Sequence, residues 1–424
     1  MNPSKDSGPT TTHGLAGPAH AGEAADGQAP AGVNRLMLLA LAVGAFSIGT
    51  DSLIISGLLD RMAADLDVTS AAAGQLISVF ALVYALSAPV LATLTSRIGR
   101  KQLLLAALAL FVVSNLLGAV APGYPLMMAS RVLAALSAGL YLPCAMVIAV
   151  STSPAPRRGR AIALVAGGMS AATALGVPLG TLIGAVGSWR VTLLLVAGLA
   201  AVAAALLVPL LPRVAPPAAV PLRRRIAVLA HPGVLAALVT NALACAGEFV
   251  LFIYIAPLTT GITGVGPAGV SAFLLVWGVA AMAGSVVGGR ASDAYGGRRA
   301  YAGAVAVLSA GLCLMALLTA LTPGTPWLAT ALYTVLLAVI GVASWALPPA
   351  QNHRIAHLDV PEPTVALSLN GSSSYLGLAA GGALGGLAMG GGSLTVLVLT
   401  ASGVSLFALA AVATSSALLK GADA

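Results

Sequence analysis

Long apolar runs separated by short polar breaks occupy most of this chain, from Arg35 to about residue 418. A run of about 20 residues is long enough to cross roughly 30 Å of hydrocarbon as a helix that rises about 1.5 Å per residue. We therefore predict an all-α polytopic membrane protein with twelve transmembrane helices, near residues 35–58, 74–95, 102–121, 125–150, 161–186, 190–211, 234–257, 268–289, 300–321, 327–350, 365–389 and 394–418.

The composition agrees with a membrane protein. Of the 424 residues, 59% are apolar and 8% are charged, with a mean hydropathy of +1.00, whereas soluble chains carry about 25% charged residues. These values exclude an ordinary cytosolic enzyme, a disordered protein and a disulfide scaffold. The three cysteines lie far apart inside apolar runs, and prolines interrupt the segment around His353 and His357. We expect no disulfide framework and no metal site.

The basic residues predict the orientation in the membrane. If the N-terminus is cytoplasmic, all but three of the 20 lysines and arginines fall in cytoplasmic segments, the exceptions being Arg61, Arg131 and Arg190. Because positive residues favour the cytoplasmic side, we expect both termini in the cytoplasm. The abundance of arginine and alanine suggests a bacterium with a high-GC genome, and we expect the protein in its inner membrane. The net charge of +8 then needs no nucleic-acid partner.

The longest internal break divides the twelve runs into two sets of six. We expect a disordered cytoplasmic tail at 1–33, a six-helix bundle at 34–211, a cytoplasmic central loop at 212–233, a second six-helix bundle at 234–419 and a cytoplasmic end at 420–424. An offset of 197 residues superimposes Gly99 on Gly296, Lys101 on Arg298 and Asp51 on Glu248. An even number of spans between the copies predicts parallel, pseudo-symmetric repeats, with a binding site between them near mid-membrane.

Two basic turns stand at equivalent places in the two halves. They read Ser96-Arg97-Ile98-Gly99-Arg100-Lys101 and Asp293-Ala294-Tyr295-Gly296-Gly297-Arg298-Arg299. A tight glycine turn presents cations at the inner ends of two spans, where they can engage helix carbonyls and carboxylates and latch one conformation. The alternative, simple cytoplasmic positive charge, explains the arginines but not the paired glycines.

A glycine face marks the fifth run, at Gly176, Pro178, Gly180 and Gly184. Glycines at every fourth position allow close helix packing, and Pro178 removes a backbone donor and bends the helix. Such faces are common in membrane bundles. The proline and the following Trp189-Arg190 pair make the pattern more specific.

Together with four further segments, these motifs resemble the major facilitator superfamily, in particular its twelve-span drug:proton antiporters related to arabinose and chloramphenicol exporters. The further segments are Gly49-Thr50-Asp51 in the first run, Ala63-Ala64-Asp65-Leu66 in the outer loop, Arg131 with Gly139, and Ser368-Leu369-Asn370. The resemblance covers about residues 35–418 and implies two six-helix bundles, gating turns and an antiporter motif in span 5. The first turn departs from the family pattern, since Ala92 replaces a glycine and Ser96 an acid.

Two acidic residues, Asp51 and Glu248, lie well inside the apolar runs. An ionised, unpaired carboxyl costs several kcal/mol inside a membrane, so a functional role is the default interpretation. We expect Asp51 to be the principal proton and substrate carboxyl, Arg131 its neighbouring charge and Glu248 its counterpart in the second half. The alternatives are a purely structural Asp51–Arg131 pair, an Arg131 that extends toward the outer interface, and a structural Glu248.

Other candidates for the lining of the substrate cavity are polar or aromatic: Asn241, Asn370, Phe249, Trp277 and Trp345. Aromatic side chains could stack on a drug, although at helical spacing they more often simply pack. Few amides or charges lie within the spans, which favours an apolar or neutral cargo.

The resemblance implies proton-coupled efflux of neutral or amphiphilic, chloramphenicol-like drugs by alternating access. The proton would be the coupling ion, with no other cofactor, and we expect a monomer in the lipid bilayer. Nucleophile-elbow, zinc-protease and nucleotide-binding motifs are absent from the sequence, so we do not expect an enzyme. The alternatives are a sugar or small-metabolite exporter of the same fold and a membrane sensor that transports nothing.

Overall fold

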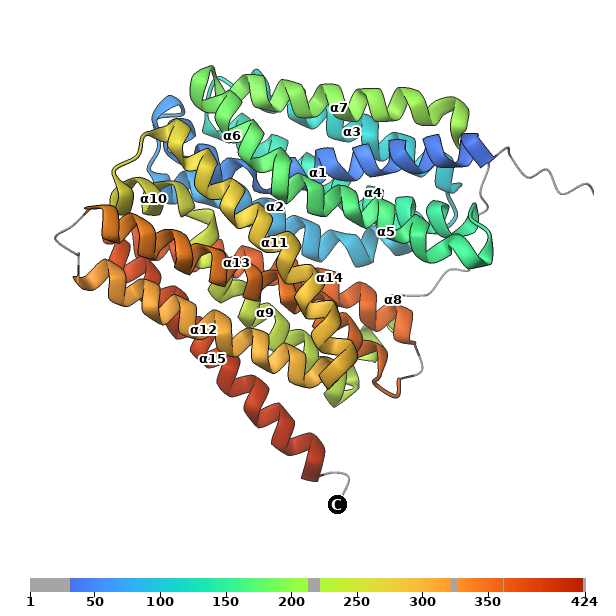
Figure 1. The fold of residues 1–424 in the computed structure, drawn as a ribbon. Coiled ribbons are helices and arrows are strands. Elements are labelled where there is room, and N and C mark those ends of the chain that lie inside the picture. Colours follow the sequence, from blue (N-terminus) through green and yellow to red (C-terminus); the bar gives the residue numbers. More distant parts are fainter. Residues whose placement is uncertain (1–30, 213–221, 322–325, 361, 422–424) are drawn as a thin grey trace, which may run out of the picture.

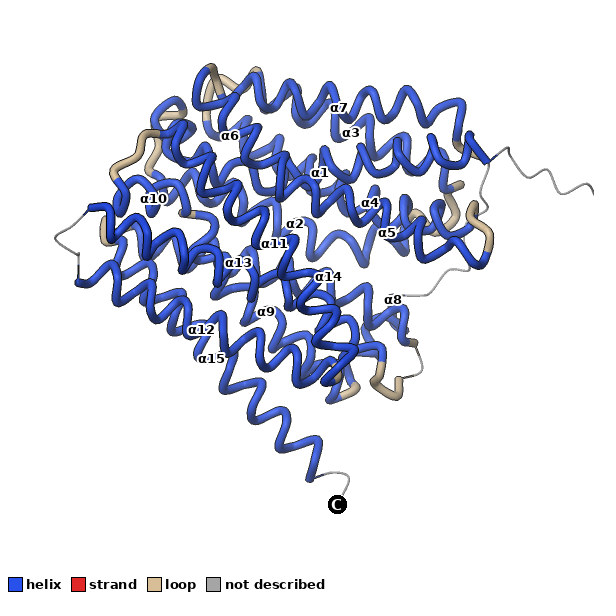
Figure 2. Tube along the Cα trace, in the orientation of Figure 1, coloured by secondary structure: helices blue, strands red, loops and turns tan. Residues whose placement is uncertain are grey.

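The computed structural model describes residues 31–212, 222–321, 326–360 and 362–421. The described residues are almost entirely helical and contain no strand (Figure 2). Most of the predicted tail and the first part of the central loop lie outside the described residues. Helix α1 begins at Ala31, inside the segment expected to be the tail.

The first half of the chain occupies the upper part of Figure 1 as six helical spans. Helix α1 extends to Asp65, beyond its predicted end at residue 58, and the fifth span begins at Ala155, before its predicted start at residue 161, and is built from four helical segments. The expected outer-loop residues Ala63, Ala64 and Asp65 therefore form the last turn of α1. The elements are α1 (Ala31–Asp65), α2 (Ser70–Leu94), α3 (Arg100–Ala119), α4 (Tyr124–Ser151), η1 (Ala155–Arg157), α5 (Arg158–Ala171), η2 (Ala172–Gly176), α6 (Val177–Val186) and α7 (Trp189–Leu210).

The second half occupies the lower part of Figure 1. Two short helices within the predicted central loop, α8 (Leu222–Ala227) and η3 (Val228–Ala230), precede it. Its main helices are α9 (Pro232–Ile253), α10 (Ile255–Thr263), α11 (Pro267–Tyr295), α12 (Gly297–Leu321), α13 (Pro326–Ala356), α14 (Pro363–Met389) and α15 (Leu394–Gly421).

Eleven of the twelve predicted spans are, within the described residues, helices apolar and long enough to cross a membrane. The twelfth, α14, has 27 residues and is about 40 Å long at 1.5 Å per residue, which is sufficient to cross. Its glycines and the Ser372-Ser373-Ser374 run lower its hydropathy. The protein therefore has the twelve-helix architecture that the apolar runs predict.

Two spans depart from regular α-helix. In the fifth, the π-helical turn η2 (Ala172–Gly176) ends two residues before Pro178. Proline cannot donate a backbone hydrogen bond. In the seventh, α9 ends at Ile253 and α10 begins at Ile255, so the span predicted at 234–257 is interrupted at Tyr254. The Tyr254 hydroxyl donates to the carbonyl of Gly382, 3.2 Å away, which anchors this break on α14.

The two halves meet mainly at the predicted outer end. One apolar cluster contains residues from both halves, including Leu58, Leu251 and Leu274, whereas a second cluster around Leu41 and Ile148 belongs almost entirely to the first half. Within the described residues, one hydrogen bond crosses between the halves, from the Gln75 side chain to the Gly382 carbonyl at 3.3 Å. This end is therefore the more firmly closed.

Glycines let backbones approach closely within the second half. A Cβ at Gly284 of α11 would collide with the carbonyl of Val342 in α13, whereas a Cβ at Gly289, five residues farther along the same helix, would meet nothing within 4 Å. Small residues drive helix association in lipid by permitting such contacts.

We predict that Gly284→Leu destabilises the protein strongly and that Gly289→Leu does not. Forcing a side chain into a packed interface typically costs about 1–3 kcal/mol, and here the obstacle is backbone. The thermal unfolding midpoint of the detergent-purified protein, followed by fluorescence-detected size exclusion, should fall by several degrees for Gly284→Leu only. Equal midpoints for the two variants would contradict the α11–α13 contact.

Candidate functional site

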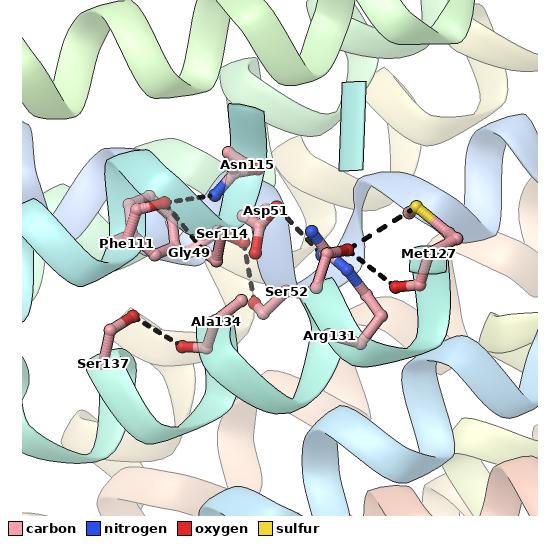
Figure 3. Close-up of polar contacts among 11 residues, drawn as sticks. Gly49, Asp51, Ser52, Phe111, Ser114, Asn115, Met127, Arg131, Ala134 and Ser137 are labelled. Atoms are coloured by element: carbon pink, nitrogen blue, oxygen red, sulfur yellow. Dashed lines mark hydrogen bonds and ion pairs between the residues drawn. The ribbon is translucent and has the colours of Figure 1, made fainter. Parts of the chain in front are cut away.

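A buried ion pair lies in the middle of the first half. Arg131 of α4 directs Nη1 at Oδ1 of Asp51 in α1, 3.0 Å away (Figure 3). The Asp51 side chain is 0% exposed and that of Arg131 is 1% exposed. The structure therefore brings together two of the three residues predicted for proton and substrate coupling.

The pair is only partly satisfied by its surroundings. Within the described residues, Asp51 Oδ2 and Arg131 Nε and Nη2 are buried without a hydrogen-bond partner. The α3 helix also contributes a buried amide at this level of the bundle, Asn115, whose Oδ1 is unpartnered (Figure 3). Sequence reasoning missed Asn115, although an amide inside the third apolar run was a signal for it.

The glycine face of the fifth span positions α1, which carries Asp51. A Cβ at any of its three glycines would collide with a side chain of α1, in matching order: Gly176 with Thr50, Gly180 with Ile54 and Gly184 with Leu58. The Thr192 hydroxyl fixes the same segment by donating to the Gly180 carbonyl at 2.9 Å. The predicted antiporter motif is thus the surface on which α1 rests, directly beside Asp51.

Burial makes this pair sensitive to a proton. Removing a carboxylate and a guanidinium from water costs several kcal/mol for each ion, and their attraction offsets that cost only while both are charged. Protonation of Asp51 would remove the partner of Arg131, and the unpartnered Oδ2 is an available acceptor. The pair can therefore link proton uptake to a rearrangement of α1 and α4.

Glu248 occupies a different environment. It lies in α9 and is 6% exposed, and within the described part of the chain it makes no ion pair, since the two ion pairs found there are Asp51–Arg131 and Asp65–Arg190. The structure therefore does not bring Glu248 to the Asp51–Arg131 pair. Its predicted role as a counterpart of Asp51 stays a prediction.

The two predicted amides belong to a polar layer in the second half. Asn241 of α9 donates through Nδ2 to the hydroxyls of Ser373 and Ser374 in α14, each at 2.9 Å. Asn370 donates to Oδ1 of Asn352 in α13 at 3.0 Å. Both amides are almost fully buried, so this layer ties α9, α13 and α14 together.

The predicted aromatic residues of the cavity pack within the second half. Trp277 is 1% exposed, and its ring lies 5.0 Å from that of Phe252. The Phe249 ring stands nearly perpendicular to the same Phe252 ring, with 6.1 Å between the two centroids. Phe249 and Trp345 are half-buried. In this conformation Trp277 is part of the apolar core, whereas the other two retain exposed surface.

Two cations of the first basic turn, Arg100 and Lys101, contact neighbouring helices of the first half. Gly99 precedes the first residue of α3, and Arg97 is exposed. Arg100 is 9% exposed and directs Nη1 toward Cys144 Sγ at 3.7 Å. Lys101 Nζ donates to the carbonyl of Leu211, the residue that follows α7, at 2.8 Å. Carbonyls at helix C-termini attract cations, so Lys101 fastens the start of α3 to the end of α7.

The second turn shows why glycine is needed there. Gly296, which separates α11 from α12, has φ +81°, a conformation that other residues rarely adopt. Asp293 is exposed and Arg298 is half-buried. The backbone N–H of Gly297 donates to Nδ1 of His353 in α13 at 3.1 Å, which closes the turn against the end of α13.

We predict that Asp51→Asn destabilises the protein and that the double variant Asp51→Asn/Arg131→Gln recovers most of that loss. The single change leaves Arg131 buried and unpaired, which typically costs about 3–5 kcal/mol, whereas removing both charges of a buried pair is often nearly neutral. The thermal midpoint of the purified variants measures this. A double variant no more stable than Asp51→Asn would show that the two residues do not act as a pair.

The chain matches known membrane transporters. The model of the Major Facilitator Superfamily matches residues 41–241. An uncharacterized MFS-type transporter of Bacillus subtilis, YbcL, is 34% identical over 84% of this chain and 89% of its own length. A chloramphenicol resistance protein of Streptomyces lividans is 36% identical over 61% of this chain and 67% of its own length.

The fold also matches a solved structure. A bacterial homologue of the human lysosomal transporter Spinster, solved inward-facing and unoccupied, superimposes with a TM-score of 0.69 over 92% of this chain and 96% of that one, at 16% identity. This likeness concerns the fold. The sequence match to YbcL over most of both chains decides the family. The chain is a multi-pass membrane protein that belongs to the major facilitator superfamily of transporters.

Proposed function

We propose that this transporter exports amphiphilic drugs from a bacterial cell in exchange for protons. The observation that carries the proposal is the Asp51–Arg131 pair, an ionisable carboxyl buried in the membrane with one oxygen unpartnered among the described residues. Ionisable groups at this depth mark proton and substrate pathways. We propose the inner membrane as its location, with both termini in the cytoplasm, and a monomer as the functional unit.

The proposed cycle couples protonation of Asp51 to rocking of the halves. With Asp51 ionised and paired to Arg131, the inward-facing transporter accepts a drug from the cytoplasm or the inner leaflet. After the halves rock and the drug leaves, a proton from outside binds Asp51 and releases Arg131. The protonated form returns to the inward-facing state, where the proton leaves. The drug and the proton bias the same conformational equilibrium in turn, so drug leaving the cell is exchanged for protons entering it.

The available energy is adequate for such a pump. A pH difference of one unit is worth about 1.4 kcal/mol per proton, and about 2.3 kcal/mol is added for each charge moved through 100 mV. Export of a neutral drug against a hundredfold gradient costs about 2.8 kcal/mol. One proton per drug molecule is therefore sufficient.

A drug is favoured as cargo by the chemistry of the helices and by one relative. The spans offer few amides or charges, whereas a sugar site needs several converging polar groups. The S. lividans relative is named as a chloramphenicol resistance protein. We therefore propose neutral or amphiphilic compounds of chloramphenicol-like chemistry as the substrate class.

We predict that Asp51→Asn abolishes proton-driven drug transport into inverted membrane vesicles. The amide cannot bind and release a proton, so an imposed pH gradient should no longer drive uptake of labelled chloramphenicol. Asp67→Asn is the matched control, because Asp67 is an exposed carboxyl outside the spans, and this variant should transport like the wild type. Unchanged proton-driven uptake by Asp51→Asn would refute the assignment.

A panel of toxic compounds in a pump-deficient host tests the substrate class separately. Expression should raise tolerance to amphiphilic compounds by at least fourfold, and a protonophore should abolish the gain because it dissipates the gradient. Unchanged tolerance to every compound, together with efflux of a labelled sugar from loaded cells, would instead establish a sugar exporter. The absence of all transport would indicate a membrane sensor.

A further inference from the structure

A pair of stacked tyrosines joins the two halves of the protein. Tyr84 of α2 and Tyr375 of α14 have ring centroids 3.8 Å apart with 28° between their planes. Phe80, one turn before Tyr84, lies 6.4 Å from the Tyr375 ring. Aromatic residues make up only 4% of the chain. Three aromatic rings at one contact between the halves are therefore an unusual local concentration.

The stack lies near the middle of its two helices, and Tyr84 points away from the exposed face of α2. Tyr84 is near the middle of the 25-residue helix α2, and Tyr375 is near the middle of the 27-residue helix α14. Leu82 and Leu86 are 43% and 60% exposed, whereas Tyr84 is 8% exposed. Because successive helical residues are about 100° apart, Tyr84 lies on the face opposite these two leucines. Transporter binding sites lie between the halves near mid-membrane.

The hydroxyls of Tyr84 and Tyr375 differ from those of Tyr141 and Tyr254. Tyr141 donates to the Leu41 carbonyl at 2.8 Å and Tyr254 to the Gly382 carbonyl at 3.2 Å. Tyr84 and Tyr375 make no such bond to the residues that the structure describes, and neither hydroxyl is among the sealed polar atoms that lack a partner. Buried tyrosines usually find a partner, so two open hydroxyls beside two ring faces provide both parts of a site for an amphiphilic ring.

We propose that Tyr84 and Tyr375 form the subsite that holds the aromatic ring of the transported compound. This inference rests on the proposed export function and specifies its substrate class as amphiphilic molecules that carry at least one aromatic ring. Tyr84 and Tyr375 belong to different halves, so their rings separate when the halves rock. The aromatic ring of the substrate then stacks on one of the two tyrosines in place of the other tyrosine. The hydroxyls then hydrogen-bond to polar substituents on the substrate.

The position of the stack gives it a role that the other aromatic residues lack. Trp277 and Phe252 both belong to the second half and are buried together, so rocking does not part them. Tyr375 is half-buried and stacks on a residue of the other half. A ring held here contacts both halves, so its binding affects their relative orientation.

Equilibrium binding to the purified full-length protein tests the subsite without requiring transport. The probes are chloramphenicol and an analogue in which a cyclohexyl ring replaces the nitrophenyl ring, measured by isothermal titration calorimetry. Loss of one aromatic contact corresponds to about a two- to tenfold loss of affinity. Tyr84→Leu and Tyr375→Leu should each weaken chloramphenicol binding by this factor and leave binding of the cyclohexyl analogue unchanged.

Two further variants serve as controls. Tyr84→Phe keeps the ring face and should retain most of the affinity for chloramphenicol. Phe273→Leu removes a ring that packs on Tyr333 within the second half, with centroids 5.4 Å apart, and should change neither affinity. Size exclusion and the thermal midpoint identify any variant that has not folded.

The outcomes separate this inference from the proposed function. If the leucine variants weaken both probes equally, or neither, or if the wild type does not bind chloramphenicol, the aromatic subsite is wrong. If the ring-selective loss is observed but wild-type vesicles transport no aromatic compound, the subsite stands and proton-driven export is wrong.

Discussion

Hydrocarbon offers no hydrogen-bond partner to a peptide group, so each crossing must satisfy its own backbone within a helix. This constraint fixes the secondary structure of the described residues. It is relaxed at η2 (Ala172–Gly176) and at Tyr254 between α9 and α10, and both irregularities are covered by protein. The first rests on α1 through Gly176, and the second on α14 through the Tyr254 hydroxyl. Irregular backbone at membrane depth is tolerated where neighbouring helices shield it from lipid.

Once the helices have formed, lipid gives them little hydrophobic reason to associate, so close packing decides the arrangement. The matched series of Gly176, Gly180 and Gly184 along α1 is the clearest example. It holds α1 with Asp51 turned toward Arg131, and their 3.0 Å contact stabilises two charges that neither helix could bury alone. The glycines and the ion pair are therefore one structural unit, in which packing provides the geometry and the charges provide the response to a proton.

The sequence was sufficient for the span count and for the partnership of Asp51 with Arg131, since long apolar runs and isolated membrane charges have few physical explanations. It also indicated the glycine face of span 5, although not which helix packs against it.

The break at Tyr254 and the extension of α1 to Asp65 were missed, because hydropathy does not register where a helix bends or how far it projects beyond the membrane. The stacking of Tyr84 on Tyr375 depends on contacts between residues almost 300 positions apart, which no local pattern reveals. Trp277, predicted to line the cavity, packs on Phe252 in this conformation, and its role in the cavity stays a prediction because ring size alone does not distinguish core from lining.

The two halves resemble each other in helix order but differ in the surroundings of their buried carboxyl groups. Asp51 faces a cation, and Glu248 makes no ion pair within the described residues. A proton added to Asp51 leaves Arg131 as an uncompensated charge inside the membrane, which changes the stability of the first half by several kcal/mol. A proton added to Glu248 leaves no such charge behind. Conversion of proton binding into movement requires a large energy difference between two protonation states. If the protein uses proton energy as we propose, that difference arises between α1 and α4 rather than in α9.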